Sequence, residues 1–354
     1  MREASAPSGK FQNDRQVVGA ENGRMRRSFF SVQRYSRAET AEDQTGGEAL
    51  MITHVRSVAL GVPDIGAARE FFEKHWQLDL VGTDADRVFL GAGCQDDHVL
   101  RLRATAEPRV DLLCLAAATG ADVDAIAERV AAHPRARLVS TPATCTDAGG
   151  GYRFRFLDCE GRTVEVSSGV TARAFRPVEP GESRPTGIGH VVLNTVDLPA
   201  TSAFYRSIFD LEVSDWVEDI MVFLRTGTAH HMLAFTRAPH TSLNHVAFEL
   251  RGIDEFMRAT GAMMQKGYAP LWGPGRHGVG ANTFTYFQEP TSRFVAEYTT
   301  GMLRIDPDHE WTPRVYPANA QTSDTWGVAA ARDEAVSATL RGCPDTGLWQ
   351  PPPA

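Results

Sequence analysis

The feature that most constrains the fold of this chain is an internal repeat. Residues 57–72 align without gaps on residues 190–205. In each copy an alternating apolar strand leads to an aspartate, Asp64 or Asp197, that can cap a helix, and the helix ends in an aromatic pair that faces a sheet. The two halves are therefore predicted to be copies of one structural unit.

Shorter strands complete this unit. They are predicted at residues 87–90 and 98–104 of the first half and at residues 221–225 and 232–236 of the second. The second half then repeats the unit, with a strand, a helix and two further strands at residues 244–250, 253–266, 283–288 and 294–299. We expect an α+β fold in which a βαβββ module is used four times. Paired modules of this kind curl into an open barrel whose interior suits a ligand.

Two polar segments set the predicted domain boundaries. Residues 1–50 are rich in Arg, Gln, Ser, Gly and Glu without periodicity, and we predict a disordered extension. The proline-rich residues 176–185 are predicted to be a linker. This leaves a first domain at residues 51–175, a second at 186–305, and a tail, 306–354, that packs back on the second domain as an extended strap.

Composition excludes several classes of function. The formal net charge is -8 and no run of Lys or Arg forms a basic patch, so nucleic acid is not expected as a partner. No apolar run approaches the roughly 20 residues that cross a bilayer, so a membrane role is not expected either. The five cysteines are scattered without a CxxC pair, which is typical of reduced thiols in a cytoplasmic protein.

Two histidines and a glutamate are the candidate metal ligands. His190 lies on the first strand of the third module, His245 on the matching strand of the fourth, and Glu297 on the last strand. Two imidazoles and one carboxylate from three strands can form a facial triad that leaves positions open for dioxygen and substrate. Each histidine alone is equally consistent with a hydrogen-bonded interior residue. Their joint placement on equivalent strands favours the metal site.

The first half provides an internal control. By the same alignment Ser57 stands in the place of His190, and a residue near Leu112 stands in the place of His245. Only Glu165 keeps a ligand-like side chain there. Histidines that served only the core would be expected in both halves. The first half is therefore predicted to be free of metal.

With these residues the second half resembles the type I extradiol ring-cleavage dioxygenases, such as catechol 2,3-dioxygenase and dihydroxybiphenyl dioxygenase. These enzymes form part of the vicinal oxygen chelate (glyoxalase/bleomycin resistance) superfamily. The resemblance covers residues 51–327, weakly in the first half and well in the second. It implies that His190, His245 and Glu297 hold Fe(II), with Mn(II) as the alternative.

Three further positions carry the resemblance. His231 lies in a strand-like segment, 229–235, and Tyr286 follows the Arg-His-Gly motif at His277 by nine residues. The resemblance implies that Tyr286 and His277 accept or hydrogen-bond the protons of a catechol. It implies that His231 stabilises an anion derived from dioxygen and later donates a proton, with His230 as a possible substitute. The alternatives are a solvated loop residue for His277 and a core aromatic for Tyr286.

The chain departs from the family pattern in the turn before the last strand. The usual Asp-Pro-x-Gly is replaced by Glu-Pro-Thr-Ser at residues 289–292, and Glu297 comes one residue later than the first copy predicts. We prefer Glu297 to Glu289 as the ligand because Glu289 is expected to point outward. His98 and the other histidines have no matched partner and are interpreted as surface or packing residues. Trp272, Phe223 and Met232 are candidates for the pocket lining.

The resemblance implies an oxidoreductase that cleaves the aromatic ring of a catechol beside its diol, with Fe(II) and dioxygen, and that forms a homo-oligomer. One alternative is another metal enzyme of the superfamily, of the isomerase, glyoxalase or 4-hydroxyphenylpyruvate dioxygenase type. A second is a binding or resistance protein without catalysis. The first alternative gives no reason for the set His231, His277 and Tyr286, and proteins of the second kind usually lack the ligand triad.

Overall fold

The computed structural model describes residues 50–352 except residues 148 and 175. These residues belong to one compact unit, residues 46–354. The expected disordered extension, residues 1–50, lies outside the described residues except for its last one. The division of the remainder into two domains stays a prediction.

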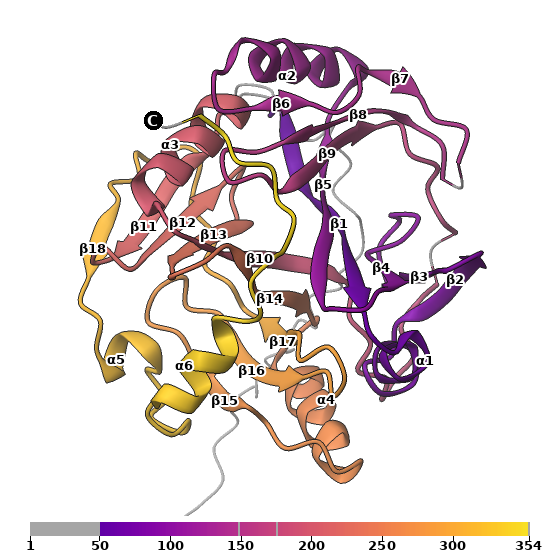
Figure 1. Cartoon of the computed structure of the whole chain (residues 1–354). Coiled ribbons are helices and arrows are strands. Elements are labelled where there is room, and N and C mark those ends of the chain that lie inside the picture. The colour runs from indigo at the N-terminus through magenta and orange to yellow at the C-terminus, as the bar shows by residue number, and fades with distance from the viewer. Residues whose placement is uncertain (1–49, 148, 175, 353–354) are drawn as a thin grey trace, which may run out of the picture. The chain divides into compact units, whose positions relative to one another are not determined.

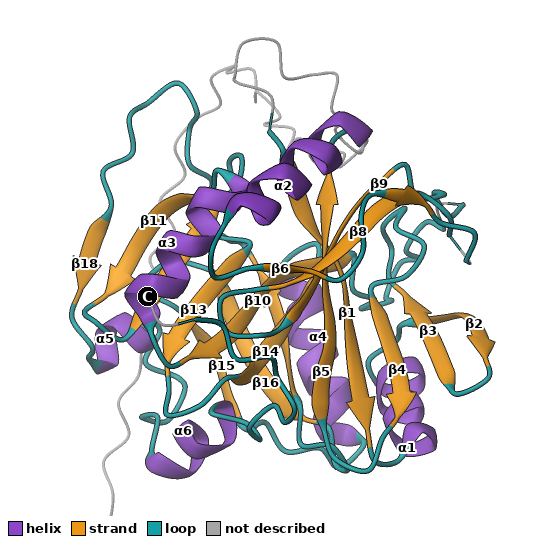
Figure 2. Cartoon of the chain, turned by 45° about the horizontal axis from the view of Figure 1, so that its top comes forward, coloured by secondary structure: helices purple, strands orange, loops and turns teal. Residues whose placement is uncertain are grey.

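Each half of the described chain forms one sheet (Figures 1 and 2). The strands of the first sheet are β1 (Ile52–Val62), β2 (Asp79–Asp84), β3 (Arg87–Gly91), β4 (Leu100–Ala104), β5 (Arg109–Ala117), β6 (Arg137–Leu138), β7 (Ala143–Thr144), β8 (Tyr152–Leu157) and β9 (Thr163–Ser168). Their order is β2-β3-β4-β1-β5-β9-β8-β6, with β7 paired to β8.

The second sheet has the order β15-β16-β17-β14-β10-β13-β12-β11-β18. Its strands are β10 (Gly187–Thr195), β11 (Glu212–Val217), β12 (Met221–Arg225), β13 (Leu233–Arg237), β14 (Ser242–Glu249), β15 (Trp272–Arg276), β16 (Thr283–Gln288), β17 (Val295–Thr300) and β18 (Arg314–Tyr316). The helices of the chain are α1 (Ile65–Arg69), which continues as the π-helix η1 (Glu70–His75), α2 (Gly120–Ala132), α3 (Leu198–Phe209), α4 (Ile253–Gln265), α5 (Ala320–Ser323) and α6 (Glu334–Leu340).

These elements confirm the α+β class and the βαβββ module. One helix follows the first strand of each module, and β1, β5, β10 and β14 are those first strands. Asp64 accepts a hydrogen bond from the backbone N–H of Ala67, and Asp197 accepts one from Ala200, so both predicted helix caps are present. The predicted strands 221–225 and 283–288 coincide with β12 and β16.

The two halves share one apolar core. Trp76, at the end of η1, stacks on Tyr298 of β17 with ring centroids 3.7 Å apart and an interplanar angle of 8°. Trp76 also meets Phe248 of β14 edge-on at 5.8 Å, and all three residues are buried. The helical segment of the first half therefore packs against β14 and β17, two of the strands that carry the predicted ligands.

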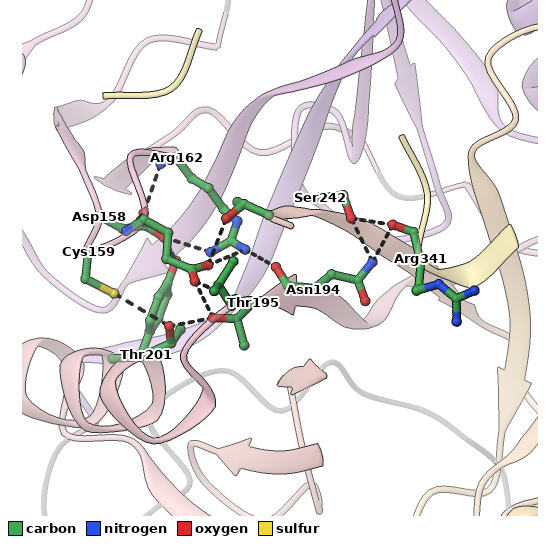
Figure 3. A network of polar contacts seen from close by, with 12 residues as sticks. Asp158, Cys159, Arg162, Asn194, Thr195, Thr201, Ser242 and Arg341 are labelled. Atoms are coloured by element: carbon green, nitrogen blue, oxygen red, sulfur yellow. Dashed lines mark hydrogen bonds and ion pairs between the residues drawn. The ribbon is translucent and has the colours of Figure 1, made fainter. Parts of the chain in front are cut away.

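A polar network joins the halves at the C-terminal end of β10 (Figure 3). Arg162, in the turn after β8, pairs with Asp158 at 3.3 Å and donates to the backbone carbonyl of Asn194. The amide nitrogen of Asn194 donates to Ser242 at 2.8 Å and to the carbonyl of Arg341 at 3.1 Å. The network thus connects the first half, the second half and the end of α6.

The tail is not simply the extended strap that was predicted. It adds β18 beside β11 in parallel and then forms the short helices α5 and α6. Figure 1 shows α5 and α6, in yellow, beside the second sheet. Along the described part of the chain, no helix has the length and apolar character needed to cross a bilayer.

Candidate metal centre

The three predicted ligands come from three neighbouring strands of the second sheet. His190 lies on β10, His245 on β14 and Glu297 on β17, and these strands stand in the order β17-β14-β10. The register pairs His245 with Val192 and Glu297 with Ala247. Because side chains alternate along a strand, this register turns all three side chains to one face.

The ligand atoms form a tight, buried group. Oε2 of Glu297 lies 2.9 Å from Nε2 of His245 and 3.3 Å from Nε2 of His190, and the two Nε2 atoms are 3.3 Å apart. The three residues are at most 5% exposed. Oε2 of Glu297 is buried without a hydrogen bond from any described residue. A buried, orphaned carboxylate oxygen facing two imidazole nitrogens fits a divalent transition metal.

The charge states also suit metal binding. Burial acts to raise the pKa of Glu297, but His190 and His245 act in the opposite direction and hold the pKa well below its usual range. Burial lowers the pKa of His245, although Glu297 opposes this effect. An ionised carboxylate and a neutral imidazole are the forms that coordinate metals.

The first half lacks the metal-binding side chains at the equivalent positions. By the same register, these positions are occupied by Ser57, Leu112 and Glu165. Oε2 of Glu165 is 2.7 Å from Nε of Arg155, so its charge already has a partner. The space around these residues measures about 40 Å³. Among the described residues, the second half holds the only such group of three potential ligands.

The turn before β17 corrects one expectation. Glu289 does not point outward: it is fully buried, and its carboxylate accepts hydrogen bonds from the backbone of Thr291 and from Ser292. The extra residue of this turn is absorbed around Arg293, whose φ is +63°. Glu297 consequently reaches the same register as its counterpart in the first half.

His231 and His230 lie side by side next to the ligands. The ring of His231 is centred 4.4 Å from that of His190 and 5.0 Å from Phe223. Its Nδ1 is 3.0 Å from Nδ1 of His230. Burial, followed by the neighbouring histidines, lowers the pKa of His231 well below the usual value, which keeps the ring neutral.

His277 and Tyr286 meet next to His245. Nδ1 of His277 faces the carbonyl of Ser323 at 2.9 Å and must carry a proton there. Burial lowers the pKa of His277 to about 4, so the ring is neutral and Nε2 accepts a hydrogen bond from the hydroxyl of Tyr286 at 3.1 Å. The ring of Tyr286 is 5.0 Å from His245. Burial, followed by Glu297, raises the pKa of Tyr286.

One cavity of about 460 Å³ connects these groups. His190, His245, His231, His277 and Tyr286 all line it. Of the predicted lining residues, Trp272 and Phe223 line the cavity. Met232 instead belongs to the apolar core.

The sequence did not indicate that the tail closes this cavity. Lining residues come from the loop before α5, from α5 itself and from the segment 327–332. Asn282 was also missed: its amide nitrogen donates to Thr299 at 3.1 Å and lies 3.5 Å from Glu297. No periodic signal could have identified these positions, because loops and short helices carry no strand alternation.

Comparison with known proteins relates this site to one superfamily. The model of the "Glyoxalase/Bleomycin resistance protein/Dioxygenase superfamily" matches residues 187–298, which contain all three ligands. Metapyrocatechase 2 of Cupriavidus necator is 27% identical over 279 residues, covering 72% of this chain and 82% of that protein. The manganese-dependent 2,3-dihydroxybiphenyl 1,2-dioxygenase of Geobacillus genomosp. 3 is 25% identical over 287 residues, covering 72% and 87%.

A solved structure is similar over most of the chain. The crystal structure of the Mn(II)-bound glyoxalase from Novosphingobium aromaticivorans shares 36% identity, with a TM-score of 0.79. The match covers 85% of this chain and 98% of that one. The chain therefore belongs to the glyoxalase/bleomycin resistance protein/dioxygenase superfamily.

Proposed function

We propose that this protein is a metal-dependent extradiol dioxygenase, which opens the ring of a catechol beside its diol with Fe(II), or with Mn(II) as the alternative. One observation carries the proposal: the two ligand histidines, His190 and His245, share a single cavity with His231, His277 and Tyr286, and Glu297 lies against both of these ligands. The curated relatives named above, a metapyrocatechase and a dihydroxybiphenyl dioxygenase, support the same reaction class.

The residues around the cavity have separate roles in the proposed reaction. When bound by His190, His245 and Glu297, the metal supplies a centre at which the diol and dioxygen exchange charge. Tyr286 donates its own proton to His277, so its oxygen is free to accept a hydrogen bond from a hydroxyl of the diol. His231, whose ring is centred 4.4 Å from that of His190, takes up a proton and, once protonated, stabilises an anion derived from dioxygen.

The test is anaerobic reconstitution with Fe(II), followed by oxygen uptake and the yellow colour of ring-opened product over a panel of catechols. We expect uptake of dioxygen in step with product formation, and at least a hundredfold loss in His245→Ala and Glu297→Gln. Glu165→Gln, at the matching position of the first half, is the control and should keep its bound metal. If no catechol is cleaved and His245→Ala behaves as the wild type does, the proposal is wrong.

A glyoxalase-type isomerase is the second candidate, because the structural relative at 36% identity is a Mn(II)-bound glyoxalase. This reaction would consume no dioxygen. Turnover of a hemithioacetal by the Mn(II)-loaded protein, without oxygen uptake on any catechol, would favour it. A protein that purifies without stoichiometric metal and binds none would instead favour the binding-protein alternative.

We further propose that the enzyme acts in the cytoplasm, as a homo-oligomer, and that residues 51–175 and 186–305 are separate domains. The free state of all five cysteines supports a reducing compartment. Light scattering on the purified protein measures the number of subunits. Limited proteolysis within residues 176–185, which contain no helix or strand, tests the domain boundary.

A further inference from the structure

A chain of three buried side chains leads away from the cavity through His231. Nδ1 of His231 is 3.0 Å from Nδ1 of His230, and Nε2 of His230 is 2.8 Å from Oδ2 of Asp215 on β11. The three residues are at most 2% exposed. Oδ1 of Asp215 accepts the backbone N–H of Arg314 at 2.8 Å, so the tail strand β18 holds the far end of the chain.

The hydrogen-bond roles follow from the carboxylate. Asp215 accepts from Arg314 and can only accept from His230, so Nε2 of His230 carries a proton. In a neutral His230, Nδ1 is then an acceptor, and the proton between the two rings belongs to Nδ1 of His231. This leaves Nε2 of His231, which makes no hydrogen bond to a described residue, as a bare acceptor.

A neutral imidazole at His230 is more favourable than a positively charged one at this position. The alternative, an imidazolium, would donate from both nitrogens and would force Nε2 of His231 to carry the proton. It would also put a positive charge one ring away from a site built for a divalent cation, and such like charges repel strongly in a buried environment. A neutral ring oriented by a buried carboxylate avoids that repulsion.

We propose that Asp215 and His230 are positioning residues that fix His231 as the Nδ1–H tautomer and thereby present a proton acceptor, Nε2, to the cavity. His231 lines that cavity beside His190. The use of this acceptor in catalysis rests on the proposed function, whereas the tautomer itself does not. In the proposed reaction, a proton leaves a hydroxyl of the diol for Nε2 of His231, and His231 later donates the same proton to the ring-opening product.

The backbone packs closely against the pair of histidines. Gly280 has a φ of +75°, and a Cβ there would lie 3.1 Å from Nδ1 of His230 and 3.2 Å from Cε1 of His231. Ser214 donates to the carbonyl of His230, and Trp311 donates to the carbonyl of Ser214 at 2.6 Å. Little room is left for either ring to turn, so the tautomer is held by packing as well as by hydrogen bonds.

The first half, which lacks the metal-binding histidines, also lacks this row of three side chains. The strand register places Asp97 and His98 at the positions of His230 and His231, although His98 was not expected to have any counterpart. There the aspartate contacts the histidine directly, at 2.9 Å. Gly82 takes the position of Asp215. The three-residue chain is therefore specific to the half that carries the triad.

The test is nitrogen-detected NMR of the full-length protein, labelled with ¹⁵N-histidine and loaded with diamagnetic Zn(II). The signals of His231 are identified by their loss in His231→Gln. We expect a protonated Nδ1 and a bare Nε2 in the wild type. In His230→Phe, which keeps a ring but removes the acceptor, and in Asp215→Leu, the proton should move to Nε2. Two variants at separate positions are used so that a folding failure of one leaves the other informative.

Two results overturn the inference: a protonated Nε2 of His231 in the wild type, or an unchanged Nδ1–H in a folded His230→Phe. Kinetics add an independent readout, since His230→Phe should lower kcat about tenfold or more with little change in KM. Asp97→Asn, at the matching position of the first half, should change neither the tautomer of His231 nor the kinetic parameters. A wild type that shows the Nδ1–H tautomer but cleaves no catechol would refute the proposed function and leave the tautomer intact.

Discussion

Nδ1 of His245 donates a hydrogen bond to Oδ1 of Asn244, the residue before it, over 2.8 Å. Nδ2 of Asn244 in turn donates to Oδ1 of Asn194 at 3.0 Å, and Nδ2 of Asn194 faces the carbonyls of Leu340 and Arg341 at 2.9 and 3.1 Å. Carbonyls only accept, so they fix the orientation of both amides. Nε2 of His245 is thereby left with a lone pair for the metal.

Replacing Asn244 by leucine should weaken metal binding about 10- to 100-fold, because His245 loses the acceptor that holds its tautomer and ring orientation. Competition with a chromophoric chelator measures the affinity. Ser242→Ala is the matched control: Asn194 keeps both carbonyl partners there, so the affinity should stay within about twofold of the wild type. Equal affinities for Asn244→Leu and the wild type would contradict the role of this chain.

His277 predicts a pH dependence of stability. Its pKa is lowered by burial from 6.5 to about 4 in the folded protein. Between these values the unfolded chain binds a proton that the folded one does not, so folding loses stability as the pH falls from about 6.5 to 4. In His277→Gln this loss is absent. The free energy of unfolding of each protein is measured by chemical denaturation at pH 7.5 and at pH 4.5. Relative to the wild type, the variant should gain about 2 kcal/mol in this free energy on going to the lower pH.

Ala329 tests whether the tail selects the substrate. It lines the cavity and packs against the apolar group around Trp272 and Phe284. Ala329→Leu should narrow the cavity and raise KM about tenfold for catechols with a bulky apolar substituent, with little effect on catechol itself. Ala335→Leu, on an exposed position of α6, should leave both KM values unchanged. A uniform effect on all substrates would argue against a selective role.

The sequence predicted the parts of the fold that depend on local periodicity. Apolar alternation alone predicts β12 and β16. The helix starts are predicted by their capping residues, Asp64 and Asp197. The segment that forms β15 contains two glycines and a proline, residues that weaken a strand pattern, so alternation does not predict this strand.

The supporting residues of the site could not be predicted from periodicity. Asn194 and Leu340 are 146 residues apart, and Asp215 on β11 is 15 residues from His230, which lies in the loop between β12 and β13. Glu289 was wrongly expected to point outward, because a carboxylate that closes its own turn has the same sequence pattern as an exposed one. Only the pairing of distant segments distinguishes these cases.

Asp324 holds the loop that closes the cavity, and its loss should open that loop. Oδ1 accepts the backbone N–H groups of Arg276 and Trp326, and Oδ2 accepts those of Val328 and Ala329, at 2.9 to 3.0 Å. Burial acts to raise the pKa of Asp324, but these four donors outweigh it and lower the pKa. The stabilisation should thus persist above pH 4 and be lost as the pH falls below the ordinary value of 3.8.

In Asp324→Asn only one oxygen remains to accept, so two of the four N–H groups lose their partner, at a cost of about 2 kcal/mol. Because the contacts are confined to the tail and β15, hydrogen exchange should accelerate at Val328 and Ala329 before it changes in β14. Asp333→Asn is the control, since Asp333 is exposed and caps α6 through the single N–H of Val336. Exchange that accelerates equally in both variants, or in neither, would show that Asp324 does not hold the loop over the metal site.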